Sequence, residues 1–193
     1  MLKIVLIRPG STDFVEEGRV QGTLDMPLNK HGAEEVARVT NELQQLGITT
    51  LYCSECEPAA QTAEALALGL GIKLKKLDGM QNLNHGLWQG MLVEEIKRKQ
   101  PKVYRQWQDE PERIIPPEGE TLADAQKRAK RVVKKLLRKH RDGHIGLVVP
   151  EPLASVVRSL LCDCELGDLW QAPSHHGQWE AIAVEQYGAA TSG

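Results

Sequence analysis

The first buried segment that the hydrophobic pattern predicts runs from residue 2 to residue 7, with a single polar interruption at Lys3. A continuous aliphatic run of this kind is typical of a strand buried on both faces, as in a parallel sheet. Pro9 and Gly10 end the strand, because proline donates no ladder hydrogen bond and glycine permits a sharp turn. Arg8 is therefore expected at the carboxyl end of a central strand, where open α/β sheets bind their ligands.

Apolar positions further along the chain take strand-like and helix-like spacing in turn. Strands are predicted at 48–53, 72–77, 144–149 and 178–186. Helices are predicted at 30–46, over the charged stretch that starts at residue 92 and is broken at Pro101, and at 122–140. A further helix is predicted to open within residues 150–161. Asn29 and Thr121 are typical N-cap residues. The long polar loop at 11–30 follows a strand end, a position where ordered loops commonly carry function.

The composition adds few constraints on function. The chain has 193 residues, of which 41% are hydrophobic and 26% charged, and its formal net charge is -2. These values are ordinary for one globular domain, and the near-neutral charge predicts neither a nucleic-acid partner nor a membrane partner. The basic run within 122–140 is interpreted as the solvated face of an amphipathic helix. With no secretory signal and no long apolar stretch recognised, a cytoplasmic location is expected.

The cysteines form two close pairs in sequence, Cys53 with Cys56 and Cys162 with Cys164. A chain of this length without a secretory signal is not expected to use them as a disulfide framework. The first pair has C-x-x-C spacing, but the second has one intervening residue, so the zinc signal is weak and buried free thiols are favoured. The adjacent His175 and His176 are interpreted as loop residues, and no metal site is predicted.

Several blocks of sequence carry a family resemblance. The first is Arg8-Pro9-Gly10-Ser11-Thr12, and the others are residues 18–29, 54–63, 82–90 and 150–153. In this order they resemble the histidine phosphatase superfamily, the group that includes the cofactor-dependent phosphoglycerate mutases, whose signature is a strand followed by Arg-His-Gly. The resemblance extends from residue 4 to about residue 185. It implies an α/β fold, with three α/β/α layers around a mostly parallel central sheet.

The same resemblance identifies chemical groups that this chain lacks. The family's phosphorylated histidine is replaced by Pro9, which has no nucleophilic side chain. Pro58 replaces an arginine that grips phosphate, Asn82 replaces the proposed proton-donating glutamate, and Pro150 replaces the second histidine. The resemblance therefore implies the family's fold without its phosphoryl-transfer groups, that is, a degenerate member.

Three hypotheses for function follow. The first is a catalytically inactive member, a pseudoenzyme, that binds a small ligand or a protein partner at or beside the former phosphate cleft. The second is a phosphatase-like hydrolase of altered chemistry in which Glu151 and His85 form a carboxylate–imidazole pair. The third is an interaction protein with a filled pocket, whose thermal stability responds to no ligand. Candidate ligand-binding residues for the first are Arg8, Gly10, Ser11, Thr12, Gln21 and Gly22.

The domain organisation is predicted to be simple. One domain is expected over residues 1–188, followed by a loose tail over residues 189–193. No cofactor is predicted. The predicted partner is an unknown small molecule or protein, and a homo-oligomer is the alternative.

Overall fold

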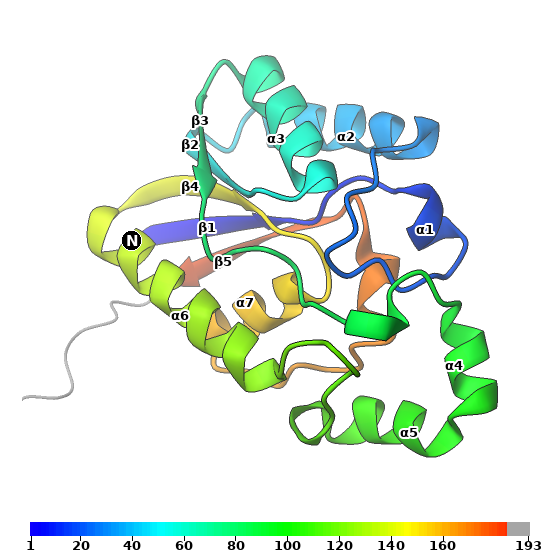
Figure 1. The fold of residues 1–193 in the computed structure, drawn as a ribbon. Coiled ribbons are helices and arrows are strands. Elements are labelled where there is room, and N and C mark those ends of the chain that lie inside the picture. The colour runs from blue at the N-terminus through cyan, green and yellow to red at the C-terminus, as the bar shows by residue number, and fades with distance from the viewer. Residues whose placement is uncertain (185–193) are drawn as a thin grey trace, which may run out of the picture.

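The computed structural model describes residues 1–184, which are built around one five-stranded sheet (Figure 1). Its strands are β1 (Leu2–Ile7), β2 (Ile48–Ser54), β3 (Lys73–Leu77), β4 (Gly143–Val148) and β5 (Trp179–Val184), in the spatial order β3-β2-β4-β1-β5. All neighbours are parallel except β1 and β5, which are antiparallel. The predicted central place of β1 is confirmed. The predicted tail at 189–193 lies outside the described residues.

Helices cover both faces of the sheet (Figure 1). On one face lie α2 (Lys30–Leu43) and α3 (Glu57–Leu70), and on the other lie α6 (Leu122–Lys139) and α7 (Leu153–Cys162). Alternate residues of β1 divide between the two layers, because successive side chains of a strand point to opposite faces. Val5 and Ile7 pack against α2 and α3, while Ile4 and Leu6 pack in the core beneath α6 and α7. The predicted three-layer α/β/α architecture is confirmed.

Shorter elements surround the carboxyl ends of the strands. They are α1 (Asp13–Glu16), α4 (Val93–Lys99), α5 (Pro101–Asp109) and the 3-10 turns Gly86–Trp88, Pro111–Arg113 and Ala172–His175. Pro101 separates α4 from α5, as the sequence predicts, because its ring is favoured at the first position of a new helix. In the part of the chain that the structure describes, no helix combines the length and the apolar character needed to span a membrane.

The turn after β1 is held closely against the start of α2. A Cβ atom on Gly10 would lie 2.4 Å from the carbonyl oxygen of Gly32, and one on Gly32 would lie 2.2 Å from the carbonyl oxygen of Ser11. Glycine is therefore required at both positions for backbone to meet backbone. This contact sets the path of residues 8–12, which form one side of the site described below.

Two helix N-termini are capped as the sequence predicts. The side chain of Asn29 accepts a hydrogen bond from the Gly32 amide at 2.8 Å, and Thr121 Oγ1 accepts one from the Asp124 amide at 3.0 Å. These bonds satisfy amides that have no partner within their own helix.

We expect Thr121→Ala to lower the free energy of unfolding by about 1 kcal/mol, because the first turn of α6 loses its cap. Urea titration followed by circular dichroism measures the loss. Thr121→Ser keeps a hydroxyl at the same place and should retain most of the stability. An equal loss in both variants would contradict the capping role.

The Cys53 thiol is buried at the end of β2, and the cysteines within the described residues are free. Burial raises the pKa of Cys53 to about 11, so the thiol stays protonated at neutral pH. This agrees with the interpretation of Cys53 as a packed apolar group.

Candidate functional site

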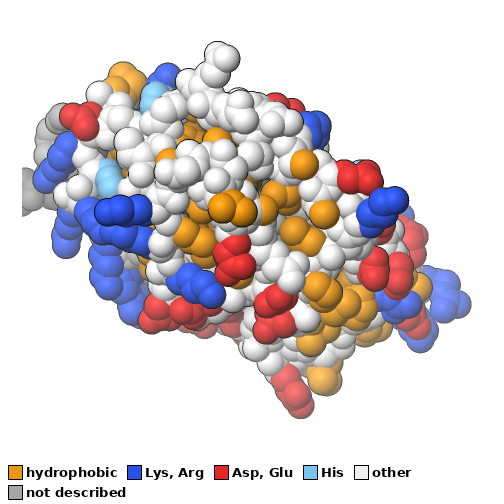
Figure 2. All heavy atoms as spheres, turned by 90° about the horizontal axis from the view of Figure 1, so that it is seen from above, with side chains coloured by type: hydrophobic (Ala, Val, Ile, Leu, Met, Phe, Trp, Pro, Cys, Tyr) orange, Lys and Arg blue, Asp and Glu red, His pale blue; other side chains and the backbone are white. Residues whose placement is uncertain are grey.

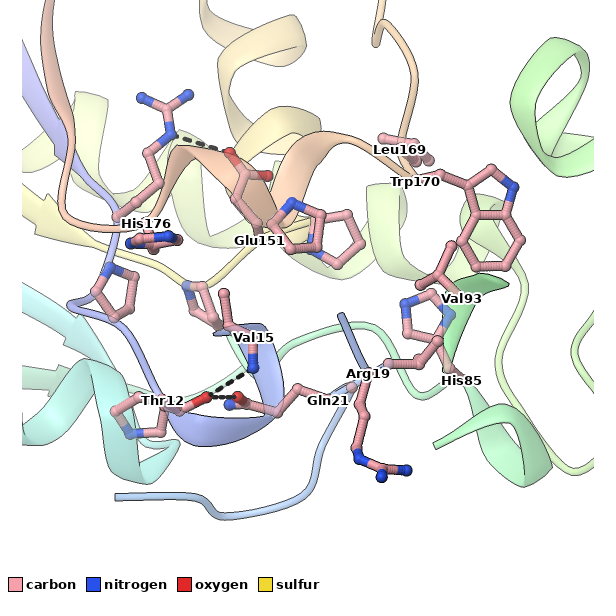
Figure 3. A pocket seen from close by; sticks show the side chains of 18 of the residues that line it. Thr12, Val15, Arg19, Gln21, His85, Val93, Glu151, Leu169, Trp170 and His176 are labelled. Carbon is pink, nitrogen blue, oxygen red and sulfur yellow. Dashed lines mark hydrogen bonds and ion pairs between the residues drawn. The ribbon is translucent and has the colours of Figure 1, made fainter. Parts of the chain in front are cut away.

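Three prolines at the carboxyl ends of the parallel strands meet in one cleft. Pro9 follows β1, Pro58 lies in the first turn of α3 just beyond β2, and Pro150 lies just beyond β4. All three line a cleft that contains about 690 Å³ of non-atom space, its open mouth included (Figure 3). The structure therefore brings together the positions at which the family resemblance expects two histidines and an arginine.

The walls of this cleft are largely apolar. Val93, Leu169 and Trp170 lie together on one side in Figure 3, beside His85, and Val15 lies on the segment that follows the first strand. Trp170 is held in place by a hydrogen bond from its Nε1 to the carbonyl oxygen of Tyr104, 2.9 Å away. A concave, mostly apolar cavity with a few polar groups is the usual form of a small-molecule site.

Arg8 lies at the carboxyl end of β1, as predicted, but its charge is already balanced. Its Nε lies 2.9 Å from Glu151 Oε1, and its Nη1 lies 2.7 Å from Glu180 Oε1. Burial favours the neutral form of Glu180, but the hydrogen bonds and charges of Arg8 and Arg158 outweigh it and lower the pKa of this carboxyl group. Glu180 is therefore ionised at neutral pH, and the two carboxyl groups that pair with Arg8 leave it little free charge with which to attract an anion.

Glu151 has no free oxygen with which to act on a substrate. Its Oε1 accepts from Arg8, and its Oε2 accepts from the amide of Ser155 at 3.0 Å and from the Ser155 hydroxyl at 2.8 Å. The carboxylate thus lies on the first turn of α7, where the helix dipole stabilises negative charge. The protein's own carboxylate occupies the place in which an α/β site could hold a phosphate.

The backbone amides after β1 also have internal partners. The Gly10 amide donates to Thr62 Oγ1 at 3.1 Å, and the Ser11 amide donates to Glu35 Oε2 at 2.8 Å. The other oxygen of the same carboxyl group, Glu35 Oε1, lies within hydrogen-bond distance of His176 Nδ1, at 2.7 Å. Gly10 and Ser11 were candidate ligand-binding residues in the sequence analysis, and the structure directs their amides to side chains of the protein itself.

Asn82 connects segments that are distant in sequence. It is 2% exposed, and its Nδ2 donates to the carbonyl oxygens of Gly22 at 3.0 Å and of Glu151 at 2.9 Å. Its Oδ1 accepts from the amide of Leu153 at 3.4 Å. At the position where the resemblance places an acid, the chain therefore has an amide that fixes one loop to another.

His85 is a buried, neutral imidazole beside the cleft. It is 5% exposed, and it packs between the rings of Trp88 and Trp107, whose centroids lie 6.4 Å and 5.5 Å away. Burial lowers the pKa of His85 to about 4. Its Nδ1 has no hydrogen-bond partner among the described residues, a costly state for a buried polar atom.

Other predicted ligand-binding residues also contribute to the cleft. Five of the six predicted residues line it, namely Arg8, Gly10, Thr12, Gln21 and Gly22. Ser11 does not line it. The Thr12 hydroxyl donates to Gln21 Oε1, as Figure 3 shows, so this pair is oriented by its own hydrogen bond. The alternative pair, Glu151 and His85, also lines the cleft, but no hydrogen bond joins the two side chains among the described residues.

Several lining residues were missed by the sequence analysis. Four of them come from α5, a loop and the 3-10 turn Ala172–His175, segments that carry no motif: Trp107, Leu169, Trp170 and Pro173. Arg19 lies in the block 18–29 but was not among the candidate residues. Tryptophan is scarce and bulky and often lines binding sites. The tryptophans in segments beyond the strand ends were therefore the signal in the sequence for this wall of the cleft.

This arrangement defines a phosphoglycerate mutase-like α/β domain with its cleft at the carboxyl ends of the strands. The model of the histidine phosphatase superfamily (branch 1) matches residues 4–192, and the chain belongs to that superfamily.

Relatives and solved structures agree with this assignment. Phosphoserine phosphatase 1 of Hydrogenobacter thermophilus is 26% identical over 186 residues, which cover 96% of this chain and 88% of the relative. Phosphoglycerate mutase-like protein 4 of Arabidopsis thaliana is 29% identical over 162 residues, 82% of this chain and 69% of the relative. The structure of Bacillus stearothermophilus YhfR superposes with a TM-score of 0.83 at 25% identity, covering 96% of this chain and 92% of the other. A mycobacterial glucosyl-3-phosphoglycerate phosphatase in complex with VO3 has the same fold, with a TM-score of 0.82, 21% identity and coverage of 94% and 90%.

Proposed function

We propose that this protein is a non-catalytic member of the superfamily that binds a small, uncharged and largely apolar molecule in its cleft. The observation that carries the proposal is the replacement of the reactive positions by Pro9, Pro58 and Pro150 around an Arg8 that two carboxylates already neutralise. A proline offers neither a nucleophile nor a proton, so a phosphoryl group would find no acceptor at these three places.

The electrostatics of the cleft support an uncharged ligand. A phosphate dianion beside Arg8 would compete with the ion pairs that Arg8 forms with Glu151 and Glu180. The amides of Gly10 and Ser11 would also have to leave their present acceptors. Each exchange breaks a hydrogen bond to a charged or polar group, at a cost of about 1–3 kcal/mol. An apolar ligand breaks none of them.

The remaining polar group suggests how such a ligand is oriented. His85 is neutral, and a neutral imidazole has one donor and one acceptor nitrogen. A planar molecule with one N–H or O–H group could pack against Trp170 and bond to the imidazole. Burying its apolar surface supplies roughly 25 cal/mol per Å².

A second candidate, a phosphomonoester hydrolase of altered chemistry, is favoured by the names of the relatives. It would depend on Glu151 and His85. At pH 7 an imidazole with a pKa of about 4 is almost entirely neutral and is a poor proton donor. Glu151 is also held by Arg8 and Ser155, so it would have to exchange partners before it could act as a base.

A matched pair of probes separates the two candidates. We expect indole at millimolar concentration to bind, as measured by saturation-transfer NMR, because it is planar and apolar and carries one N–H donor. We expect 3-indoxyl phosphate, which adds a phosphoryl group to the same ring system, to bind more weakly and to remain unhydrolysed. Intact-mass spectrometry should detect no phosphorylated protein. Binding of the phosphate with rejection of indole, or turnover above the enzyme-free rate, would overturn the proposal.

Two tryptophan variants control for the site. Val15→Trp fills the cleft and should abolish the indole signal, whereas Leu68→Trp adds the same side chain on α3 at a residue that is 86% exposed and outside the cleft. The second variant should bind indole as the unaltered protein does. Loss of the signal in both, or in neither, would place the binding elsewhere.

A further inference from the structure

The folded chain separates its charges although its net charge is close to zero. The outer side of α6 carries seven exposed lysines and arginines between Lys127 and Lys139, and residues 125–141 contain no aspartate or glutamate. Lys73 and Lys75 of β3 are exposed on the same side of the sheet as α6. We call Lys73, Lys75 and the exposed basic residues of α6 the basic face. Figure 2 shows lysine and arginine side chains gathered on the side of the molecule where β3 and α6 lie in Figure 1.

The fold orients this face outward. Lys127, Arg131, Lys134 and Arg138 recur at four, seven and eleven residues after the first, so they lie along one side of the helix over about 16 Å. The opposite side of α6 is fixed in the core by its buried apolar residues, which are Leu122, Ala125, Ala129, Val132, Val133 and Leu136. The stripe cannot turn inward without removing these side chains from the core.

The charges of the basic face have no internal counter-ions. Within residues 1–184, none of its side chains forms an ion pair, whereas Arg128, on the flank of α6, pairs with Glu120 at 2.6 Å. Lys75 lies against Lys139, and this contact with a second ammonium group lowers the pKa of Lys75. Two cations held together with no carboxylate between them repel each other, and an external anion would relieve that repulsion.

We propose that the basic face binds the phosphate backbone of a nucleic acid through charge, without reading its bases. Phosphate contacts require lysine and arginine and little else. A protein partner fits less well, because protein interfaces are depleted in lysine and rely on apolar or aromatic anchors. Among residues 1–184, the exposed large hydrophobic residues are Met1, Leu24, Leu68, Leu87 and Ile115, none of which belongs to α6 or β3. The same absence on these two elements disfavours a membrane surface, where apolar side chains usually assist the charges.

This inference is independent of the proposed function. No residue of the basic face lines the cleft, so a ligand and a nucleic acid would use different surfaces. The near-neutral net charge was the reason that the sequence analysis expected no nucleic-acid partner. The folded distribution of the same charges gives a local positive field, and it is the local field that attracts a polyanion.

Fluorescence anisotropy with a labelled 20-base-pair DNA duplex tests the proposal. We expect micromolar binding at 50 mM NaCl and about a 100-fold loss of affinity at 200 mM NaCl, as for about four neutralised phosphates. The triple variant Lys127→Glu, Lys134→Glu, Arg138→Glu should weaken binding at least about tenfold. The milder triple Lys127→Gln, Lys134→Gln, Arg138→Gln should weaken it less, and circular dichroism verifies that both variants fold.

The matched control applies the same charge change elsewhere. Lys97→Glu, Arg98→Glu, Lys102→Glu alters three exposed cations on α4 and α5 and should leave the affinity within about threefold. Equal losses in the two glutamate triples, or no binding to the duplex at 50 mM NaCl, would overturn the proposal. So would tighter binding of polyglutamate or of phosphatidylserine vesicles than of the duplex.

Discussion

We expect Arg8→Met to lower the free energy of unfolding by about 3–5 kcal/mol, a loss that urea titration at pH 7 would measure. The variant leaves Glu151, whose side chain is 4% exposed, without the cation that compensates its buried charge. It also removes the 2.7 Å ion pair with Glu180. Methionine keeps a long side chain in the same space, so the effect reports the charge and not a cavity. A loss of this size would indicate that Arg8 stabilises the fold through its ion pairs with Glu151 and Glu180.

Two further variants test this assignment for Arg8. Arg158→Met removes the other cation beside Glu180, but the Arg158 side chain is 43% exposed, so the cost should stay below about 1 kcal/mol. Combining Arg8→Met with Glu151→Gln removes both charges of the buried pair and should recover at least half of the lost stability. Additive losses in the combined variant would show that Arg8 and Glu151 do not compensate each other.

Lowering the pH from 7 to 5 should destabilise the protein by about 2 kcal/mol through His85 alone. Burial lowers the pKa of His85 to about 4 in the folded protein, and the unfolded chain has the ordinary value of about 6.5. Between these two values the unfolded state binds the proton and the folded state does not, so stability falls as the pH falls through this window. Below about pH 4 both states are protonated and this contribution is lost in full.

A comparison of variants isolates the contribution of His85 to the pH dependence of stability. His85→Phe keeps an aromatic ring between Trp88 and Trp107 but cannot titrate, so its stability should change by about 2 kcal/mol less than that of the unaltered protein over the same pH range. His175→Phe changes an exposed histidine and should leave the pH dependence as it was. His140, whose pKa burial also lowers, is present in both variants and cancels from the comparison. Identical pH profiles for His85→Phe and the unaltered protein would contradict the buried neutral imidazole.

Most of the architecture could be predicted from local patterns in the sequence. The aliphatic run of β1 predicted a strand buried on both faces, and its central place between β4 and β5 is confirmed. Caps at Asn29 and Thr121 and the break at Pro101 follow from short-range chemistry that acts within one helical turn. The predicted last strand at 178–186 begins at Trp179 and is described to Val184, where the described part of the chain ends.

Part of the candidate site could be predicted from the sequence. Arg8, Gln21 and Gly22 line the cleft because strand ends and the loop after β1 converge in any parallel sheet of this order. The partners of Arg8 could not be predicted. Glu180 is 172 positions away in sequence and reaches Arg8 because β5 is antiparallel to β1 and places its residues beside the end of that strand. Neighbours across a sheet are set by register, and register is a property of the whole fold.

By itself, the sequence determined the α/β layering and the identity of the residues at the strand ends, because buried periodicity and proline or glycine geometry act locally. The tertiary structure alone decided what those residues do. It paired Arg8 with two carboxylates and buried His85 in its neutral form. It also placed the unpaired basic residues of α6 and β3 on one positive face, away from the acidic residues that balance them in the net charge. Charge balance and protonation depend on distances between groups far apart in the chain, and folding sets those distances.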